Sequence, residues 1–264
     1  MTGLPRKGAL KAFKSFHKSS DSHKMKYAII ADIHSNLEAF QTVLKDSEEQ
    51  GCTHYACLGD VVGYGADPKA CLDMVRDMDI PVVKGNHDEY IGSEMDLDGF
   101  NAHAAQAVIW TREQLTDEDR KWLNGLKYLR MVQNFTIVHA TLDVPRKWGY
   151  VFDKLAAAAS FTYQNTSVCF FGHTHVPVAY VRDAGVRGGS YSKFNVEQGK
   201  KYFVNVGSVG QSRDGVPKAT YAIYDMDEHT IELRRLDYDM ETTKQKILDA
   251  GLPPRLAERL DVGR

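Results

Sequence analysis

The feature that most constrains this chain is a short apolar run followed at once by acids, histidines or an amide, repeated along the sequence. In the first third of the chain the pairs are 26–31 with Asp32-Ile33-His34, 54–58 with Gly59-Asp60, and 80–84 with Gly85-Asn86-His87-Asp88. Segments of helical periodicity lie between these runs. Alternating strands and helices predict an α/β fold, in which the carboxyl ends of the strands share one edge of the sheet. We therefore expect these polar residues to gather there.

The rest of the chain continues this pattern and then becomes rich in β-structure. A predicted hairpin of 128–132 and 135–138 ends at His139, and the run 167–171 ends at Gly172-His173-Thr174-His175. Beyond Pro177, alternating apolar and β-branched residues predict further strands. The elements expected there are strands at 178–182, 202–206, 220–224 and 230–236, a turn-rich hairpin connection at 185–199, and helices at 241–250 and 255–260.

We expect one domain over residues 25–264, with a helical insert around residues 88–127 that is predicted from amphipathic patterns. Residues 1–24 differ because they carry six basic residues against the single acid Asp21. A flexible basic extension is the expected interpretation, because a basic run is usually solvated. The alternatives are a transit-like or membrane-touching segment, or residues upstream of a natural start at Met25.

Composition excludes several classes of function. A formal net charge of −2 provides no basic field for specific nucleic-acid binding, and no apolar run approaches the roughly 20 residues of a membrane span. The cysteines, Cys52, Cys57, Cys71 and Cys169, have no CxxC spacing. Reduced thiols and a cytoplasmic location are therefore expected. The oligomeric state stays open.

The polar residues at the predicted strand ends are of the types that bind metal ions. Five of the ten histidines lie there, beside acids and one asparagine. A single histidine of this kind is more often a surface or hydrogen-bonded residue than a ligand. As a group, oxygen and imidazole ligands without thiolate suit Mn, Fe, Zn, Co or Ni and argue against a structural zinc site. Two such ions, about 3.5–4 Å apart, can share a hydroxide and promote displacement at phosphorus.

These residues resemble a known family in order, spacing and strand-end context. The five motifs of the calcineurin-like metallophosphoesterases are matched by Asp32-x-His34, Gly59-Asp60, Gly85-Asn86-His87-Asp88, His139 and Gly172-His173-x-His175. The runs 35–40, 63–68 and 207–215 further resemble the compact prokaryotic phosphodiesterase branch, often named after diadenosine tetraphosphatases and serine/threonine phosphatases. The resemblance covers Met25 to about Leu260. It implies a four-layer α-β-β-α sandwich with two central mixed β-sheets.

The resemblance also implies a role for each motif residue. One divalent metal ion would be held by Asp32, His34, Asp60 and His175, and a second by Asp60, Asn86, His139 and His173, with Asp60 bridging the two. His87 would not be a ligand but would stabilise the phosphoryl transition state or protonate the leaving oxygen, and Asp88 would orient it.

Two further residues are candidates for substrate binding. Arg213 lies in a glycine-bounded loop after a predicted strand, where a guanidinium could bind a phosphate oxygen. The alternative is an exposed arginine paired with Asp214. Tyr64 lies in the loop after the bridging aspartate, where it either contacts a substrate group or only packs the loop.

We therefore expect a metal-dependent hydrolase, with manganese among the candidate ions, that acts on phosphodiester or phosphomonoester bonds of a small-molecule substrate. The reaction implied is direct attack of a metal-bridging hydroxide. The alternative is a non-catalytic protein-interaction scaffold of the same fold, such as the subunit of the retromer sorting coat. A scaffold is expected to have lost ligands or the catalytic histidine, whereas here every motif position is filled. A nuclease would require a basic groove.

Overall fold

The structure, a computed structural model, describes residues 24–98 and 101–264. Apart from Lys24, the predictions for the basic segment 1–24 lie outside the described residues. The helices are α1 Leu37–Glu49, α2 Pro68–Asp77, α3 Asn86–Gly92, α4 Ala102–Gln114, α5 Asp117–Gly125, α6 Lys154–Tyr163, α7 Met240–Asp249 and α8 Pro254–Val262, with a 3-10 turn at Pro145–Lys147. The strands are β1 Lys26–Ile30, β2 His54–Cys57, β3 Leu129–Val132, β4 Phe135–Val138, β5 Val168–Phe171, β6 Val178–Arg182, β7 Val186–Gly189, β8 Lys193–Asn195, β9 Lys201–Asn205, β10 Ala219–Asp225 and β11 Thr230–Leu236.

Two mixed sheets form the centre of the molecule. The first has five strands in the order β2-β1-β10-β11-β8, and the second has six in the order β3-β4-β5-β9-β6-β7. Strands β1 and β2 are parallel, as are β4, β5 and β9, and the other neighbours are antiparallel. Four of these parallel strands, β1, β2, β4 and β5, are ones that the sequence predicts to end in polar residues.

Strand β1 shows how the two sheets pack. Tyr27 and Ile29 lie in the core between the sheets, where the Tyr27 ring meets the Phe135 ring edge-on at 5.0 Å. Ala28 and Ile30 point the other way, into a core shared with the helices. Side chains alternate along a strand, so a strand buried on both faces is apolar throughout. This explains why the run 27–31 is continuously apolar rather than alternating.

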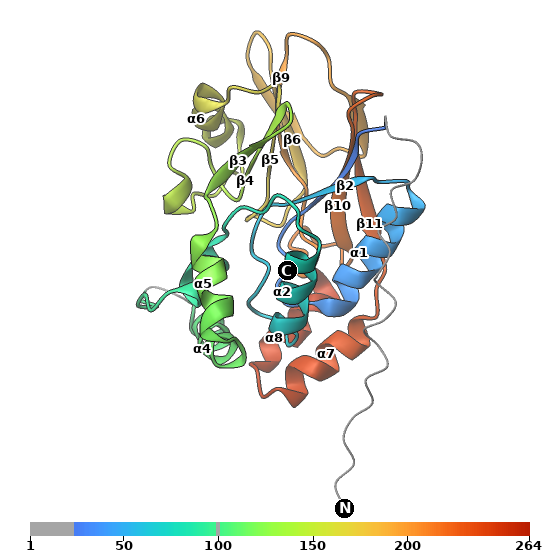
Figure 1. Cartoon of the computed structure of the whole chain (residues 1–264). Coiled ribbons are helices and arrows are strands. Elements are labelled where there is room, and N and C mark those ends of the chain that lie inside the picture. The colour runs from blue at the N-terminus through green and yellow to red at the C-terminus, as the bar shows by residue number, and fades with distance from the viewer. Residues whose placement is uncertain (1–23, 99–100) are drawn as a thin grey trace, which may run out of the picture.

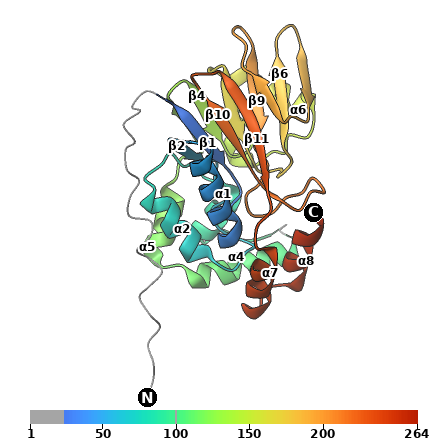
Figure 2. The ribbon, with the colours of Figure 1, turned by 90° about the vertical axis from the view of Figure 1, so that its right-hand side faces the viewer.

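Helices cover the outer faces of both sheets, as Figures 1 and 2 show. Helices α1 and α2 pack on the first sheet through Phe40 and Leu72, and α6 packs on the second through Phe161. The predicted α-β-β-α sandwich with two mixed sheets is therefore confirmed. Helices α4, α7 and α8 share a smaller apolar core beyond the strand ends, and Figure 2 shows them together at that end of the molecule.

Two segments differ from the prediction. Residues 80–84 do not form a regular strand but make only single bridges, from Val82 to Cys57 and from Val83 to Lys127. Of these two bridges only the one from Val82 reaches β2, and the chain then turns into α3. The connection 185–199 contains two short strands in different sheets, because β7 pairs with β6 and β8 pairs with β11.

The predicted helical insert around 88–127 contains α3, α4 and α5. Its description as an insert within one domain stays a prediction. Among the described residues, no helix has the length and apolarity that a membrane-spanning segment requires. The thiols of all four cysteines are free, and those of Cys57, Cys71 and Cys169 are buried.

Candidate metal centre

The ends of four strands bring the predicted motif residues together. The residues concerned are Asp32 after β1, Asp60 after β2, His139 after β4, and His173 and His175 after β5. Backbone hydrogen bonds join these ends: Asp32 N donates to Gly59 O at 3.0 Å, and Gly172 N donates to His139 O at 2.9 Å. Asn86, the first residue of α3, is half-buried, whereas the other predicted ligands are buried.

Asp32, His34 and His175 form one cluster of facing ligand atoms. His34 Nε2 lies 3.2 Å from His175 Nε2, and His175 Nε2 lies 3.3 Å from Asp32 Oδ1. Asp60 Oδ2 lies 3.5 Å from His34 Nε2. The ligand atoms of Asp32, His34 and His175 all lie within 4.8 Å of one another, so one ion could contact all three.

Asp60 also faces a second cluster. The same Oδ2 atom lies 3.4 Å from His139 Nε2, and Asn86 Oδ1 lies 3.2 Å from that nitrogen. Asp32 Oδ1 is 4.0 Å from His139 Nε2. One carboxylate oxygen of Asp60 therefore lies between His34 and His139, which is the position that a carboxylate bridging two ions would take.

Hydrogen bonds on the outer side of the imidazole rings determine which nitrogens face the clusters. Nδ1 lies beside a backbone carbonyl oxygen in three rings: His34 beside Val62 at 3.3 Å, His139 beside Leu58 at 2.8 Å and His175 beside Gln211 at 2.5 Å. A carbonyl oxygen only accepts, so each Nδ1 carries the hydrogen and Nε2 of the neutral ring presents a lone pair. Lone pairs and carboxylate oxygens then face one another, an arrangement that a divalent cation satisfies. The donor set therefore fits divalent metal ions.

Burial and the carboxylates set the protonation of these rings. Burial lowers the pKa of His34 and of His175 well below the ordinary value, so both rings are neutral near pH 7. Burial acts in the same direction on His139, but the neighbouring Asp60 carboxylate outweighs it and raises the pKa of His139 to about 9. A proton and a metal ion compete for this nitrogen, so metal binding there would release a proton.

His173 lies at the edge of the centre. Its Nε2 donates to the carbonyl oxygen of Trp148 at 2.9 Å, which leaves Nδ1 as the acceptor. Its ring lies 5.0 Å from the ring of His139, and the ring of Tyr150 stacks on it at 4.3 Å. Within the described part of the chain, no group of three close acid, histidine or cysteine ligand atoms includes His173. Its role as a ligand therefore stays a prediction, and the sequence did not indicate the contacts with Trp148 and Tyr150.

His87 contacts Asp60 from the first turn of α3. Its backbone N donates to Asp60 Oδ1 at 2.8 Å, and its ring lies 4.9 Å from the ring of His34 and 4.3 Å from that of Tyr64. Burial lowers the pKa of His87 to about 4, so the ring is neutral near pH 7. A ring nitrogen of His87 lies within 4.8 Å of ligand atoms of His34 and Asp60. Distance alone therefore does not distinguish a ligand from a group that contacts substrate.

Asp88 contacts the backbone of the loop that carries Asp60. Its carboxylate accepts hydrogen bonds from four backbone N–H groups, those of Asp60, Val61, Val62 and Gly85, at 2.8, 3.0, 3.5 and 3.0 Å. These bonds join the start of α3 to the loop that carries Asp60. Burial raises the pKa of Asp88 to about 7. Asp88 therefore positions the Asp60 loop, and its predicted role of orienting His87 stays a prediction.

Five of the predicted ligands have left-handed backbone conformations. The φ angles are 54° for Asp32, 48° for His34, 51° for Asp60, 66° for His173 and 59° for His175. Non-glycine residues seldom adopt such angles, at a cost of about 1–3 kcal/mol each, and they concentrate where function requires a particular side-chain direction. The loops that form the centre are therefore strained, and the surrounding sandwich holds them in place.

Gly85 is required for space rather than for an unusual backbone. Its φ of −96° and ψ of 173° suit any residue. A Cβ atom at Gly85 would contact the Asp60 carboxylate, lying 2.6 Å from its Cγ. The side chain of Asp60 occupies the volume that any other residue would fill.

Replacement of Gly85 by alanine should therefore displace Asp60 and lower the metal content. Overpacking of this kind costs about 1–3 kcal/mol. The measurements are metal content by mass spectrometry and thermal unfolding. Gly125→Ala is the matched control, because a Cβ there meets no atom within 4 Å and the backbone does not need glycine. Full metal content in Gly85→Ala would contradict the steric argument.

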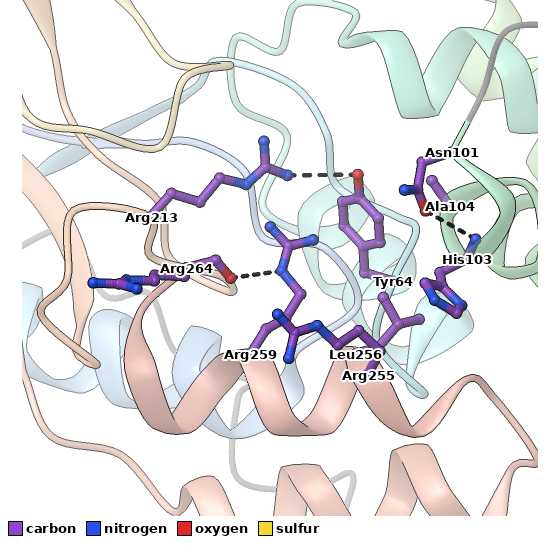
Figure 3. A pocket seen from close by; sticks show the side chains of 9 residues that line it. All are labelled: Tyr64, Asn101, His103, Ala104, Arg213, Arg255, Leu256, Arg259 and Arg264. Carbon is purple, nitrogen blue, oxygen red and sulfur yellow. Dashed lines mark hydrogen bonds between the residues drawn. The ribbon is translucent and has the colours of Figure 1, made fainter.

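Tyr64 and Arg213 lie between the centre and a cavity of about 420 Å³. Arg213 N donates to His175 O at 3.3 Å, and its Nη2 lies 3.1 Å from Gln211 Oε1 and 3.5 Å from Tyr64 Oη. Figure 3 shows the last of these contacts. The alternative in which Arg213 pairs with Asp214 is wrong, because Asp214 pairs with Arg235 instead.

Sequence reasoning missed the contribution of α8. Arg255 and Arg259 of α8, with Arg264 just beyond its end, line the same cavity, and Figure 3 shows Arg255 and Arg259 on the helix below Tyr64 and Arg213. The spacing of Arg255 and Arg259 puts both on one face of a helix. Arginines at this spacing are common on exposed helices, so this signal could not have indicated a site without the tertiary structure.

Comparison with known proteins agrees with this geometry. The family model for the calcineurin-like phosphoesterase superfamily domain matches residues 25–229. An uncharacterized protein of Methanocaldococcus jannaschii is 37% identical over 245 residues, which cover 91% of this chain and 99% of the relative. A metallophosphoesterase from Sphaerobacter thermophilus is 35% identical with a TM-score of 0.83 over 91% of this chain and 100% of that one. A hypothetical protein from Pyrococcus horikoshii, 18% identical with a TM-score of 0.73 over 91% of this chain and 99% of that one, shares the fold.

Proposed function

The chain belongs to the calcineurin-like phosphoesterase superfamily, and from this premise we propose that it is a dinuclear metal-dependent hydrolase of phosphodiester or phosphomonoester bonds. One observation carries the proposal: a single Asp60 oxygen lies 3.5 Å from His34 Nε2 and 3.4 Å from His139 Nε2, between two clusters of candidate ligand atoms. A centre for one ion needs no such shared oxygen. Two ions that are joined by a carboxylate require one carboxylate within reach of both.

Each residue of the centre has a proposed function. Asp32, His34, Asp60 and His175 would hold one ion, and Asp60, Asn86, His139 and His173 the other. The ions, when bound, would supply an activated water as nucleophile and neutralise charge on the phosphoryl oxygens. Neutral Asn86 adds a ligand without adding negative charge near an anionic substrate. The backbone carbonyls of Val62, Leu58 and Gln211 hold the rings with Nε2 inward.

His87 and Arg213 are proposed to contact the reacting phosphoryl group. A neutral His87 ring can donate one N–H to an oxygen that gains charge in the transition state. Arg213 brings a fixed positive charge beside His175 and can bind a phosphate oxygen. Neither contact forms a covalent bond with phosphorus, so attack by water is direct and needs no enzyme nucleophile.

The scaffold alternative is less well supported by the same residues. A protein that uses this fold only for binding has no need to keep strained ligand loops or a buried His87. Here the donor atoms converge, and five of the predicted ligands have left-handed backbones. Such strain persists where a function depends on it.

Metal dependence is tested with the full chain and two model substrates, p-nitrophenyl phosphate and bis(p-nitrophenyl) phosphate. We expect turnover with added Mn, Ni or Co, loss of turnover after treatment with a chelator, and recovery when the ion is restored. Metal content by mass spectrometry should be close to two ions per chain. Two ions per chain without turnover on a broad panel of phosphate esters would favour the scaffold.

A further inference from the structure

A strongly cationic pocket adjoins the candidate metal centre. Four arginines, Arg213, Arg255, Arg259 and Arg264, line the cavity of about 420 Å³. Figure 3 shows the side chains of Arg255 and Arg259 extending from α8 toward the loops that carry Tyr64 and Arg213. Parts of the chain far apart in sequence thus form one pocket, and only one of its arginines, Arg213, belongs to the loops of the centre.

In the part of the chain that the structure describes, acidic side chains give the four arginines of this pocket little compensation. Among the described residues, Arg255 is the only one of the four with an acidic partner, Glu258 at 3.4 Å on the exposed face of α8. Arg259 Nε donates to the backbone oxygen of Arg264. Burial lowers the pKa of Arg259, and the charge of Arg213 acts in the same direction. The guanidinium groups therefore repel one another, at a cost that a bound anion would offset.

Arg213 supplies a second, independent sign of a missing ligand. Its Nε is buried and has no hydrogen-bond partner in the described part of the chain. A buried N–H donor is seldom left without an acceptor in a folded protein, because its desolvation costs about 1–3 kcal/mol. The pocket therefore lacks an acceptor at Arg213, where an anion would provide one.

The pocket and the metal centre share a wall. The Tyr64 ring lies 4.7 Å from the ring of His34 and 4.3 Å from that of His87, and the guanidinium carbon of Arg259 lies 5.9 Å from the centre of the same ring. The carbon of Arg213 lies 5.8 Å from it. An anion among the arginines would therefore be a near neighbour of a phosphoryl group at the metal centre, on the opposite side of Tyr64.

We infer that this pocket binds a second phosphate group of the substrate, so that the preferred substrates are small phosphoesters with at least two phosphate groups. The inference rests on the proposed phosphoesterase function. Several planar guanidinium groups suit a multiply charged oxyanion with several acceptor oxygens better than a single carboxylate. A cavity of about 420 Å³ is of the size of small-molecule sites. The net charge of −2 gives no extended basic surface for a nucleic-acid polymer.

The first test measures binding without turnover. Inorganic pyrophosphate is titrated calorimetrically into the full-length chain in buffer containing a chelator. We expect binding by the wild type that weakens about tenfold or more in Arg255→Ala and in Arg259→Met, which keeps an apolar stem against Tyr64. Arg187→Ala is the matched control, because Arg187 is also exposed and paired within its own segment, with Asp183. Equal affinity in all four proteins, or none in the wild type, would overturn the inference.

The second test measures preference. Nucleoside diphosphates, nucleoside 3′,5′-bisphosphates and dinucleoside polyphosphates are compared with their one-phosphate counterparts, using metal-loaded protein. At least one two-phosphate compound should have a kcat/KM about tenfold higher than its counterpart, and the α8 variants should remove this advantage while Arg187→Ala keeps it. Turnover that does not depend on Arg255 or Arg259 would overturn this inference but would leave the proposed hydrolase function intact. Arginine-dependent binding of pyrophosphate without turnover of any ester would instead count against the proposed hydrolase.

Discussion

Replacement of Asp60 by asparagine is expected to remove most of the bound metal and to lower turnover by about 10³-fold or more, equivalent to about 4 kcal/mol. The Asp60 Oδ2 atom lies between His34 and His139, so the substitution weakens both proposed ion sites at once. An amide oxygen carries no full charge to hold two cations. The measurements are metal content by mass spectrometry and kcat/KM on bis(p-nitrophenyl) phosphate.

The control for this variant is Asp119→Asn. Asp119 is also buried and charged, but it pairs with Arg76 at 2.9 Å and caps α5 through Thr116, away from the centre. This substitution should lower the unfolding temperature and leave metal content unchanged. If Asp60→Asn kept two ions and full turnover, the bridging role of Asp60 would have to be abandoned.

Replacement of His87 by alanine is expected to keep both ions and to lower kcat by about 10²-fold or more, the typical loss for one donor to a developing oxyanion. His87 is proposed to contact the phosphoryl group, and its backbone N–H, which holds Asp60 Oδ1 at 2.8 Å, remains in the variant. The Asp60 carboxylate should therefore keep its position. Metal content and kcat, measured on the same preparation, separate the two effects.

Asn86→Ala provides the contrast with His87→Ala. Asn86 Oδ1 lies 3.2 Å from His139 Nε2, so its loss should lower occupancy of the second proposed ion, and added metal should restore part of the rate. Loss of metal in His87→Ala would instead identify His87 as a ligand, as its distance to His34 and Asp60 permits.

Much of the fold could be predicted because the local signals were strong. Continuous apolar runs at β1 and β5, the side chain of Asn36 accepting from Ala39 N at the start of α1, and Pro68 at the start of α2 are features of short segments. The prediction of a strand at 80–84 was wrong because the apolar residues of this segment are buried without regular strand pairing. Burial selects apolar residues whether or not a ladder of hydrogen bonds forms, so composition alone could not distinguish the two cases.

Residue types and their order along the chain thus determined which side chains enter the centre, because acids and histidines at strand ends have few structural reasons to be there. Only the tertiary structure decided how they act together. In the structure, one Asp60 oxygen lies near both His34 and His139, and the Asp88 carboxylate accepts hydrogen bonds from the backbone of the Asp60 loop. Helix α8 and Tyr64 line the same cavity. These relations depend on contacts between residues far apart in sequence. The spacing of the strands and the strained loops determine such contacts, whereas the periodicity of a single segment carries no information about them.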